Sequence, residues 1–358
     1  MKIKFFMAVV LNAVLFTSCE SDNEIIEIPE EQIGNYSEGI FILNEGNFGS
    51  GNSSVSFLDT DFQEITNNIY AEENDGKSPG DTGQSMGFYE DYAFIVMNVS
   101  GKIEVVNRHT FKYVTTIETG LDNPRFIDFS NEKAFVSNWG DGMDPDDDFI
   151  AVYDLGNFEL EDTIPVEEGP ETLMTINNRV YVAHEGGFSF NNKISVIDPE
   201  DNTIQEIIEV GDVPNSMVSN GNSLWVLSSG LPAYAEEETP GKITQIDLIN
   251  HQVVNELNFD NNAHPSNLNF DDEMLYYTLN DRVYEIHVTN QELPGSQFTE
   301  FIDEGILYGF KVADGKIYAA FANYDFTGDG KLIVQDKTGN SKLEFSTGIN
   351  PNGIYIVE

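Results

Sequence analysis

The chain has 358 residues, of which 40% are hydrophobic and 12% are aromatic, so it can bury a sizeable core. Its 17 basic residues stand against 62 acidic ones, and the formal net charge is −45. A surface this acidic repels phosphate backbones and anionic lipid headgroups, which argues against nucleic-acid binding and against charge-driven membrane docking. The simplest interpretation of the acidity is solubility. The only cysteine, Cys19, leaves no disulfides and no cysteine-based catalysis for the rest of the chain.

The N-terminus has the pattern of a bacterial signal peptide. Lys2 and Lys4 give a basic start, the segment 5–16 is almost entirely apolar, and small residues precede Cys19. The apolar segment is too short for a stable membrane span. Cys19 stands where bacterial lipoprotein precursors are cleaved and lipidated. The sequence therefore predicts a signal peptide at 1–18, an acidic tether at 19–35 that begins with lipidated Cys19, and a folded domain at 36–358.

The folded domain repeats one phrase seven times, at intervals of 41 to 51 residues. Each copy has an anchor residue in a loop, then a strand, a tight turn and a second apolar strand. The anchors are Gly83, Pro124, Pro170, Pro214, Pro265, Leu307 and Pro351. In the first six copies, ten residues separate the anchor from the second strand, as from Pro124 to Ala134. A fixed offset repeated in this way indicates one supersecondary unit that has been copied.

Each copy also carries a third strand, such as 150–154 or 194–198, and most carry a weaker fourth one. Four strands in about 45 residues, without a long helical pattern, are typical of propeller blades. The last copy, at 350–357, has only a first strand, whereas 39–43 is a second strand without a first. Pairing the strand at 350–357 with the strand at 39–43 would complete a seventh blade and remove the open strand edges that a linear array exposes. The sequence predicts an all-β, seven-bladed β-propeller, four strands per blade, closed by the C-terminal strand joining the N-terminal blade; a β-solenoid is the alternative.

The loops between second and third strands vary most in length, and they emerge on the same face as the loops that join the blades. Variable loops on a rigid scaffold are the usual place for binding. Aromatic residues in these loops are predicted to wall a ligand platform, with packing between blades as the alternative role of any one of them. They are Phe48, Trp139, Phe188, Phe190, Tyr234 and Tyr324.

The residue after each anchor is expected on the innermost strand, at the mouth of the ring. All seven are polar: Gln84, Arg125, Glu171, Asn215, Ser266, Tyr308 and Asn352. Four of them, Gln84, Arg125, Asn215 and Tyr308, are predicted to form a polar floor for the ligand. An ion pair between Arg125 and Glu171, in adjacent blades, is an equally good interpretation of those two residues.

Catalytic and metal-binding motifs are missing from the sequence. It has no nucleophile elbow, no zinc-binding HExxH, no phosphate loop and no haem-attachment cysteines. Of five histidines, only His184 and His264 fall near the predicted binding face. The acidic loops 141–148 and 325–330 do not match the spacing of an EF-hand, so solvated loops are the default interpretation. The sequence predicts a protein that is not an enzyme, with no metal site and no covalent cofactor.

The Asn-Pro anchors, the Tyr-Val second strands and the Ile-x-Val-Ile-Asp third strands resemble YncE-like seven-bladed propellers across nearly the whole mature chain. The segments 43–49, 53–56 and 81–86 resemble more specifically a surface-lipoprotein branch of Bacteroidota that includes the BtuG-type proteins. The acidic cluster after Cys19 is similar to the export signal of such lipoproteins. The resemblance implies a lipid-anchored protein of the bacterial outer membrane, exposed at the cell surface, that captures cobalamin or a related corrinoid for a TonB-dependent transporter.

Two alternatives stay open from the sequence. The same capture role could serve another large nutrient, such as haem, a siderophore or a glycan. The propeller could instead be an enzyme, such as a lactonase or a quinoprotein-like protein, because propeller active sites leave weak traces in sequence. Blade motifs define the fold and say little about the ligand.

Overall fold

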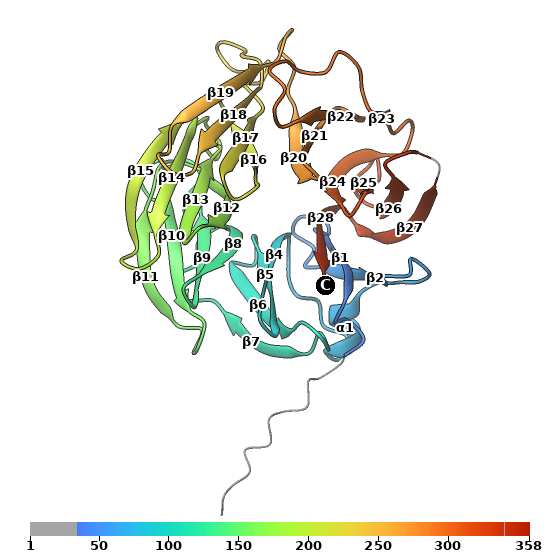
Figure 1. The fold of residues 1–358 in the computed structure, drawn as a ribbon. Helices are drawn as coiled ribbons and strands as arrows, with labels where there is room; N and C mark the ends of the chain where they lie inside the picture. Colours follow the sequence, from blue (N-terminus) through green and yellow to red (C-terminus); the bar gives the residue numbers. More distant parts are fainter. Residues whose placement is uncertain (1–33, 340) are drawn as a thin grey trace, which may run out of the picture. The chain divides into compact units, whose positions relative to one another are not determined.

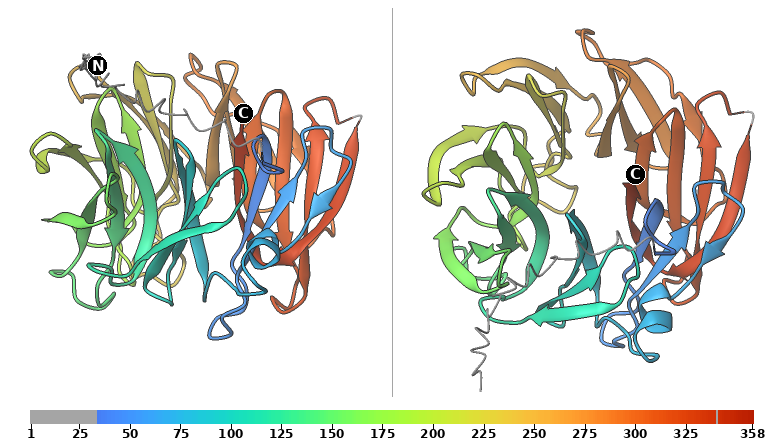
Figure 2. Two further views of the ribbon diagram at one scale, coloured as in Figure 1. Left: turned by 90° about the horizontal axis from the view of Figure 1, so that it is seen from below. Right: turned by 60° about the horizontal axis from the view of Figure 1, so that its bottom comes forward.

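The computed structural model describes residues 34–339 and 341–358. Within this part, seven four-stranded antiparallel sheets form blades around a common centre (Figures 1 and 2). This arrangement confirms the predicted seven-bladed propeller. The predicted signal peptide, the lipidation site Cys19 and most of the tether lie outside the described residues.

Blade 1 combines the two ends of the described chain: from the centre outward it contains β28 (Pro351–Val357), β1 (Gly39–Asn44), β2 (Ser54–Leu58) and β3 (Ile65–Thr66). The other blades follow chain order from the centre outward. Blade 2 contains β4 (Gly83–Tyr89), β5 (Tyr92–Met97), β6 (Lys102–Asn107) and β7 (Tyr113–Ile117); blade 3 contains β8 (Pro124–Ser130), β9 (Lys133–Asn138), β10 (Phe149–Asp154) and β11 (Leu160–Pro165); blade 4 contains β12 (Pro170–Ile176), β13 (Arg179–His184), β14 (Lys193–Asp198) and β15 (Thr203–Glu209). Blade 5 contains β16 (Pro214–Ser219), β17 (Ser223–Ser228), β18 (Lys242–Asp247) and β19 (Val253–Asn258); blade 6 contains β20 (Ser266–Asp271), β21 (Met274–Leu279), β22 (Arg282–His287) and β23 (Thr299–Glu300); blade 7 contains β24 (Ile306–Ala313), β25 (Lys316–Ala322), β26 (Asp329–Asp336) and β27 (Lys342–Ile349).

The ring closes through the pairing of β28 with β1, in which Phe41 lies opposite Tyr355. Figure 1 shows β28 at the centre of the ring, beside β1. This is the closure expected from the two incomplete ends of the repeat. It is favourable because a closed ring leaves no unpaired first or last blade.

The hydrophobic core lies between the blades. Second and third strands are buried on both faces, as in β5 and β14, because a neighbouring blade covers each face. They therefore have continuous apolar runs rather than alternation. The outer strand β15 alternates exposed residues with partly buried or buried ones, since one of its faces meets solvent. This difference explains why the fourth strands were the weakest in the sequence.

One helix, α1 (Ile69–Glu73), was not expected. It lies in the link between blades 1 and 2, where Ile69 and Tyr70 are buried and the Tyr70 hydroxyl donates to Glu104 Oε2 at 3.0 Å. Five residues are too few to show a helical period in the sequence. Among the described residues, no helix has the length and apolar character needed to cross a membrane.

Each first strand carries a β-bulge near its start. The register of β4 against β5 shifts between Gly83 and Ser85, and that of β8 against β9 shifts between Pro124 and Ile127. A bulge leaves a residue without a ladder partner and re-aims its side chain. The residues in the bulges include Gln84, Arg125, Glu171, Asn215, Tyr308 and Asn352. In blade 6 the bulge falls after Ser266 rather than on it. Ser266 therefore keeps a regular ladder partner, Thr278, unlike the other predicted mouth residues.

Candidate functional site

The centre of the candidate site is a buried ion pair between blades 3 and 4. Arg125 Nε donates to Glu171 Oε2 at 2.7 Å, and Arg125 Nη2 donates to Glu171 Oε1 at 2.6 Å. The two side chains are only 15% and 8% exposed. Such a two-point contact matches the planar guanidinium to the carboxylate. The structure therefore confirms the pairing of Arg125 with Glu171 that the sequence offered as one interpretation.

Trp139 supports this pair from the start of the loop after β9. The Arg125 guanidinium lies 4.0 Å from the centroid of the Trp139 ring, within the range of a cation–π interaction. The indole Nε1–H donates to the Pro170 carbonyl at 3.1 Å, across the boundary between blades 3 and 4. Trp139 thus contributes to packing between blades as well as to the wall of the mouth.

Two more carboxylates lie at the mouth in matching positions, each directly after a second strand: Glu45 after β1 and Glu185 after β13. The Tyr308 hydroxyl donates to Glu45 Oε2 at 2.5 Å. Burial raises the pKa of Glu45 above its ordinary value, although the Tyr308 hydrogen bond and the Arg125 charge oppose this. Burial and the charge of Glu171 raise the pKa of Glu185 to about 8, against the opposing effect of Arg125.

Four of the predicted residues line one cavity beside this cluster. This inner cavity has a volume of about 510 Å³, and its walls include Phe48, Trp139 and Phe188, with Arg125 as a polar component. Phe48 is 82% exposed and Phe188 is 71% exposed. Asn98 and Asn123 add amide groups from blades 2 and 3. The cavity is within the size range of ligand sites in proteins.

The sequence profile of a domain of unknown function, DUF5074, matches residues 38–305. The chain belongs to this family. The match runs from the start of β1 to the link before β24, so it spans most of the propeller and the whole inner cavity of this DUF5074 protein. No curated protein matches the sequence.

Several solved structures are similar in fold to this DUF5074 propeller. Hydrazine synthase of Kuenenia stuttgartiensis has a TM-score of 0.60 at 16% identity, over 87% of this chain and 99% of that chain. Dihydro-heme d1 dehydrogenase NirN in complex with DHE has a TM-score of 0.58 at 14% identity, over 90% of this chain and 76% of that chain. BamB from Moraxella catarrhalis has a TM-score of 0.55 at 12% identity, over 90% and 92% of the two chains. At these identities the likeness shows the fold alone.

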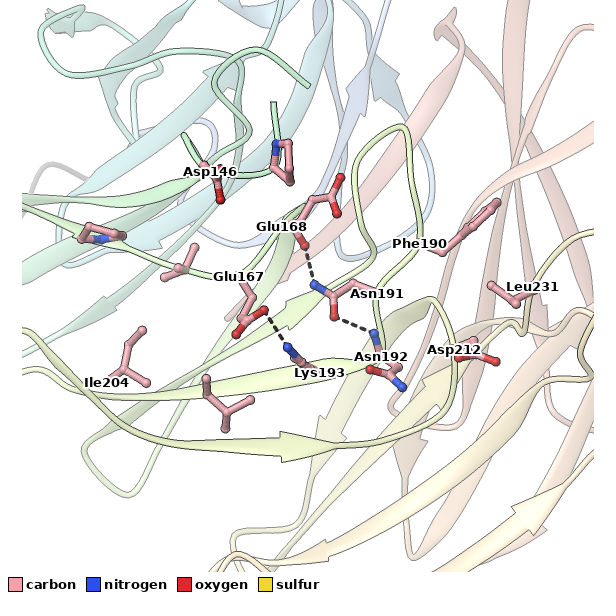
Figure 3. Close-up of a pocket in the computed structure, with 14 residues that line it drawn as sticks. Asp146, Glu167, Glu168, Phe190, Asn191, Asn192, Lys193, Ile204, Asp212 and Leu231 are labelled. Atoms are coloured by element: carbon pink, nitrogen blue, oxygen red, sulfur yellow. Dashed lines mark hydrogen bonds and ion pairs between the residues drawn. The ribbon is translucent and has the colours of Figure 1, made fainter. Parts of the chain in front are cut away.

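The other predicted aromatic residues of this DUF5074 protein lie outside the inner cavity. Phe190 lines a larger groove of about 860 Å³ beside blade 4, together with Leu231. Figure 3 shows Phe190 and Leu231 on one side of this groove, Ile204 on the other, and Lys193 bound to Glu167 between them. Tyr234 contacts Phe190, with ring centroids 6.0 Å apart. The loop 185–192 thus contributes Phe188 to the inner cavity and Phe190 to the larger groove beside blade 4.

Tyr324 lies apart from both sites, in a third groove on blade 7. Tyr308, in contrast, faces the mouth through its bond to Glu45, and its ring contacts Phe326 at 5.9 Å between centroids. The six aromatic wall residues therefore do not form one continuous platform. The structure brings together Phe48, Trp139 and Phe188 in one cavity, and it places Phe190 with Tyr234.

The polar floor is already hydrogen-bonded in part. Asn215 Nδ2 donates to the Pro265 carbonyl at 3.0 Å, and Asn352 Nδ2 donates to the Gly83 carbonyl at 2.8 Å. Each bond joins a blade to the anchor of the next one. The Gln84 side chain makes no hydrogen bond to the residues that the structure describes, so its amide is available at the mouth. Asn215 has less capacity left for a ligand than the sequence suggested.

The two histidines near the face are bound to the protein. His184 is fully buried, with Nδ1 at 2.8 Å from the Glu167 carbonyl and Nε2 at 2.9 Å from Ser195 Oγ. Because a carbonyl only accepts, Nδ1 carries the proton and Nε2 accepts from Ser195. Burial lowers the pKa of His184 to about 4, so the ring is neutral at pH 7. His264 lies between the Ser229 carbonyl and Glu238.

The acidic loops use several carboxylates to fix their own backbone. Asp147 accepts from the backbone N–H of Asp141, and Asp325 accepts from those of Thr327 and Gly328. Asp148 is buried and accepts from Gly169 N–H at 3.1 Å, and burial raises its pKa to about 6. Over residues 34–339 and 341–358, no group of three or more His, Cys, Asp or Glu side chains is placed to hold a metal ion.

Sequence reasoning placed Glu171 at the mouth but missed Glu45 and Glu185 as members of the site. The two missed residues share a position, because each directly follows a second strand. The residue after the second strand is also Asn98 in blade 2 and Trp139 in blade 3, and both donate to the anchor carbonyl of the next blade. Aligning the blades on this second position would have found the carboxylates.

Proposed function

We propose that this chain is a non-enzymatic capture protein that binds a large nutrient, cobalamin or a related corrinoid, at the mouth of the propeller and passes it to a TonB-dependent transporter. The observation that carries the proposal is the inner cavity. It combines two aromatic side chains that are more than 70% exposed, Phe48 and Phe188, with a rigid polar cluster around Arg125. Exposed apolar surface of this kind marks interaction sites.

A corrinoid suits such a cavity because of its shape and its edge. Its broad ring has apolar faces that pack against aromatic walls, and its peripheral carboxamides need hydrogen-bonding partners. Asn98 Nδ2 donates to Asn123 Oδ1 and to the Pro124 carbonyl, which leaves Asn98 Oδ1, Asn123 Nδ2 and the Gln84 amide for a ligand at the mouth. Glu45 and Glu185 add two carboxyl groups. The cavity of about 510 Å³ would hold part of the ligand. The rest of the ligand would contact the exposed aromatic lip of the cavity, formed by Phe48 and Phe188.

A binding role rather than catalysis is supported by how the ionisable groups are used. Arg125 is bound to Glu171, and the Tyr308 hydroxyl is bound to Glu45. His184 is enclosed and neutral, which leaves it unsuited to proton transfer with a ligand. These groups hold the shape of the mouth.

The start of the described chain supports anchoring through Cys19. Gly34 N–H donates to Ser37 Oγ at 3.2 Å, and Tyr36 N–H donates to the His109 carbonyl at 3.0 Å. His109 lies in the turn between β6 and β7, and such turns emerge on the face opposite the mouth because the strands alternate in direction. A tether attached there leaves the mouth free. Cys19→Ala should abolish fractionation with the outer membrane; retention of that variant in the membrane would exclude the anchor.

Calorimetry with cyanocobalamin tests the ligand. We expect one binding site on the full chain, lost in a Phe48→Ala/Phe188→Ala variant. Ile249→Ala is the matched control, since Ile249 is 91% exposed in a turn of the opposite face. No heat of binding at micromolar ligand would exclude cobalamin. Binding of haem, a siderophore or a glycan in the same cavity would then identify one of the other nutrients.

A further inference from the structure

The loop that carries Phe48 is exposed at its tip and held at its base. It comprises residues 45–53, which link β1 to β2, and it contributes Phe48 to the inner cavity. Asn47 Nδ2 donates to the Phe326 carbonyl of blade 7 at 2.8 Å, and Asn47 N–H donates to Asn52 Oδ1 at 2.8 Å. Blade 7 and a side chain of the loop itself therefore fix the base of this Phe48 loop.

Asp81, in the link between blades 1 and 2, holds the tip. Its Oδ1 accepts from Gly49 N–H at 3.1 Å, and its Oδ2 accepts from Gly51 N–H at 3.2 Å. Gly49 and Gly51 have φ values of 78° and 60°, a left-handed conformation that glycine adopts without strain. A Cβ added at either position would meet no atom within 4 Å. The backbone conformation that directs both N–H groups to Asp81, rather than a lack of space, therefore explains the two glycines.

The Asp81 carboxylate is itself fixed by its neighbours. Asp81 N–H donates to Ser100 Oγ at 2.8 Å, and the Thr82 hydroxyl donates to Asp81 Oδ1 at 3.0 Å. Thr82 has a φ of 57°, which is strained for a β-branched residue. Such strain persists where the surrounding structure over-determines the conformation, and it is frequent at ligand clamps. The carboxylate is therefore aimed at the Phe48 loop and is not free to rotate.

Ser100 places this contact beside a second wall of the inner cavity. It lies in the turn between β5 and β6, here called the 98–101 turn. This turn contributes three residues to the wall: Asn98, Val99 and Gly101. Asp81 thus joins two walls of one cavity, the Phe48 loop of blade 1 and the 98–101 turn of blade 2. Two segments that are separate in the sequence, 43–49 and 81–86, meet at this contact.

We propose that Asp81 is a positioning residue for ligand capture: it holds the Phe48 loop against the 98–101 turn, so that the inner cavity has its binding shape before a ligand arrives. The inference rests on the proposed capture function for the place of binding, and it adds the group that preorganises this place. Preorganisation raises affinity because a loop that is ordered in advance loses less conformational entropy on binding.

A role in fold stability alone does not explain these bonds. Residues 48–52 are exposed, and Phe48 packs in none of the core clusters between the described blades. The two bonds from Asp81 therefore order a segment on which the core does not depend. Both carboxylate oxygens of Asp81 face the loop, which also separates this role from direct contact with a ligand.

The first test needs no ligand and measures amide hydrogen exchange by NMR on the full chain. Asp81→Ala removes both acceptors, so exchange at Gly49 and Gly51 should become about tenfold faster while thermal unfolding changes little. Asp81→Asn keeps one acceptor oxygen and should lie between Asp81→Ala and the native protein. Unchanged exchange at both glycines in Asp81→Ala would overturn the inference.

Asp59→Ala is the matched control for this measurement. Asp59 accepts from Gln63 N–H at 2.8 Å in the turn between β2 and β3, on the opposite face of blade 1. The control removes the same charge and the same type of bond. It should leave exchange at Gly49 and Gly51 unchanged.

The second test is calorimetry with cyanocobalamin. Asp81→Ala should weaken binding about tenfold, Asp81→Asn should weaken it less, and Asp59→Ala should leave it unchanged. Because Asp81 acts through the position of Phe48, adding Asp81→Ala to Phe48→Ala should weaken binding little further. Fully additive effects of the two substitutions would overturn the inference, since Asp81 would then act independently of Phe48.

The two tests separate failure of the inference from failure of the proposed function. Native binding of cyanocobalamin with equal affinity in Asp81→Ala would overturn the inference and leave the capture function intact. Absence of cyanocobalamin binding to the native protein would overturn the proposed ligand. The exchange measurement would then still decide whether Asp81 positions the loop: faster exchange in Asp81→Ala supports this role, and unchanged exchange overturns it.

Discussion

Arg125 in β8 and Glu171 in β12 occupy the same position in neighbouring blades, and they bind each other through two hydrogen bonds of 2.7 and 2.6 Å. Both sit in the bulge that follows an anchor proline. The bulge turns both side chains out of the ladder, and the adjacent blades bring them together. The pair is therefore a contact between blades as well as the polar centre of the mouth.

Removal of one partner should destabilise the propeller strongly. Arg125→Met leaves Glu171 buried without its cation and beside Glu185, and we expect a loss of about 3–5 kcal/mol in the free energy of unfolding in urea at pH 7. The double variant Arg125→Met/Glu171→Met removes both charges and should recover much of this loss. If Arg125→Met has the same midpoint urea concentration of unfolding as the native protein, the ion pair contributes nothing to stability.

Trp139 should prove important for both folding and binding. Trp139→Phe keeps an aromatic ring near Arg125 and loses the hydrogen bond to the Pro170 carbonyl, so we expect a stability loss of about 1 kcal/mol with cyanocobalamin affinity nearly retained. Trp139→Ala also removes the ring and should weaken binding by ten- to a hundredfold, about 1.4–2.8 kcal/mol. Calorimetry on the folded fraction separates the two effects. Unchanged affinity per folded molecule in Trp139→Ala would make Trp139 a packing residue only.

Phe48 and Phe188, the exposed aromatic lip of the inner cavity, should affect ligand affinity and leave the stability of the fold unchanged. Phe48→Ala and Phe188→Ala remove side chains that are mostly in solvent, so thermal unfolding should change little. Each variant should weaken cyanocobalamin binding by about tenfold if the ring packs on the ligand. Tyr324→Ala, in a separate groove of the same face, is the matched control and should leave binding unchanged. If Tyr324→Ala weakens binding as much as Phe48→Ala does, the ligand site is broader than the inner cavity.

The fold was predictable from the sequence because its cause is repeated there. The offset between Pro124 and Ala134 recurs in the first six copies, since each of those blades needs the same turn and the same buried second strand. The bulges follow the anchors for the same reason, which is why Arg125 and Tyr308 were placed correctly at the mouth. The helix α1 was missed because a single turn of helix in a link has no repeat to reveal it.

The details of the site were less predictable because its partners come from the next blade. Whether Asn215 is free depends on the Pro265 carbonyl, fifty residues further along the chain. Whether Trp139 packs or binds depends on Arg125 and Pro170 together. Residue type and blade position were visible in the sequence, but the pairing of donors with acceptors required the three-dimensional arrangement. For the same reason, six aromatic residues that looked equivalent lie in different grooves.

Acid should destabilise the protein through His184. Its pKa is lowered from 6.5 to about 4 in the folded state because the ring is buried. Between these values the unfolded chain binds a proton that the folded chain does not, so the stabilisation present above pH 6.5 is lost as the pH falls towards 4. Urea unfolding at pH 7 and pH 5 measures this. The glutamine of His184→Gln cannot titrate, so the free energy of unfolding of this variant should fall less between pH 7 and pH 5. An equal fall in the variant and the native protein would assign the acid sensitivity to other groups.

Val213 should be the easiest position at which to stabilise the propeller. It precedes the anchor Pro214 and has a φ of 56°, a left-handed conformation that is strained for a β-branched residue. The corresponding positions in blades 1 and 3 are Asn350 and Asn123, at φ of 55° and 54°, and asparagine tolerates this region. The backbone of Val213 is held by its N–H bond to the Asn191 carbonyl and by the Ser229 N–H bond to its own carbonyl, neither of which needs the side chain. Val213→Asn should therefore keep the conformation and raise the free energy of unfolding by about 1 kcal/mol.

Val213→Ala, which is also strained at this φ, should gain less. Thermal and urea unfolding give the ranking, and an asparagine variant that is less stable than the native protein would mean that the valine side chain packs well enough to outweigh the backbone strain.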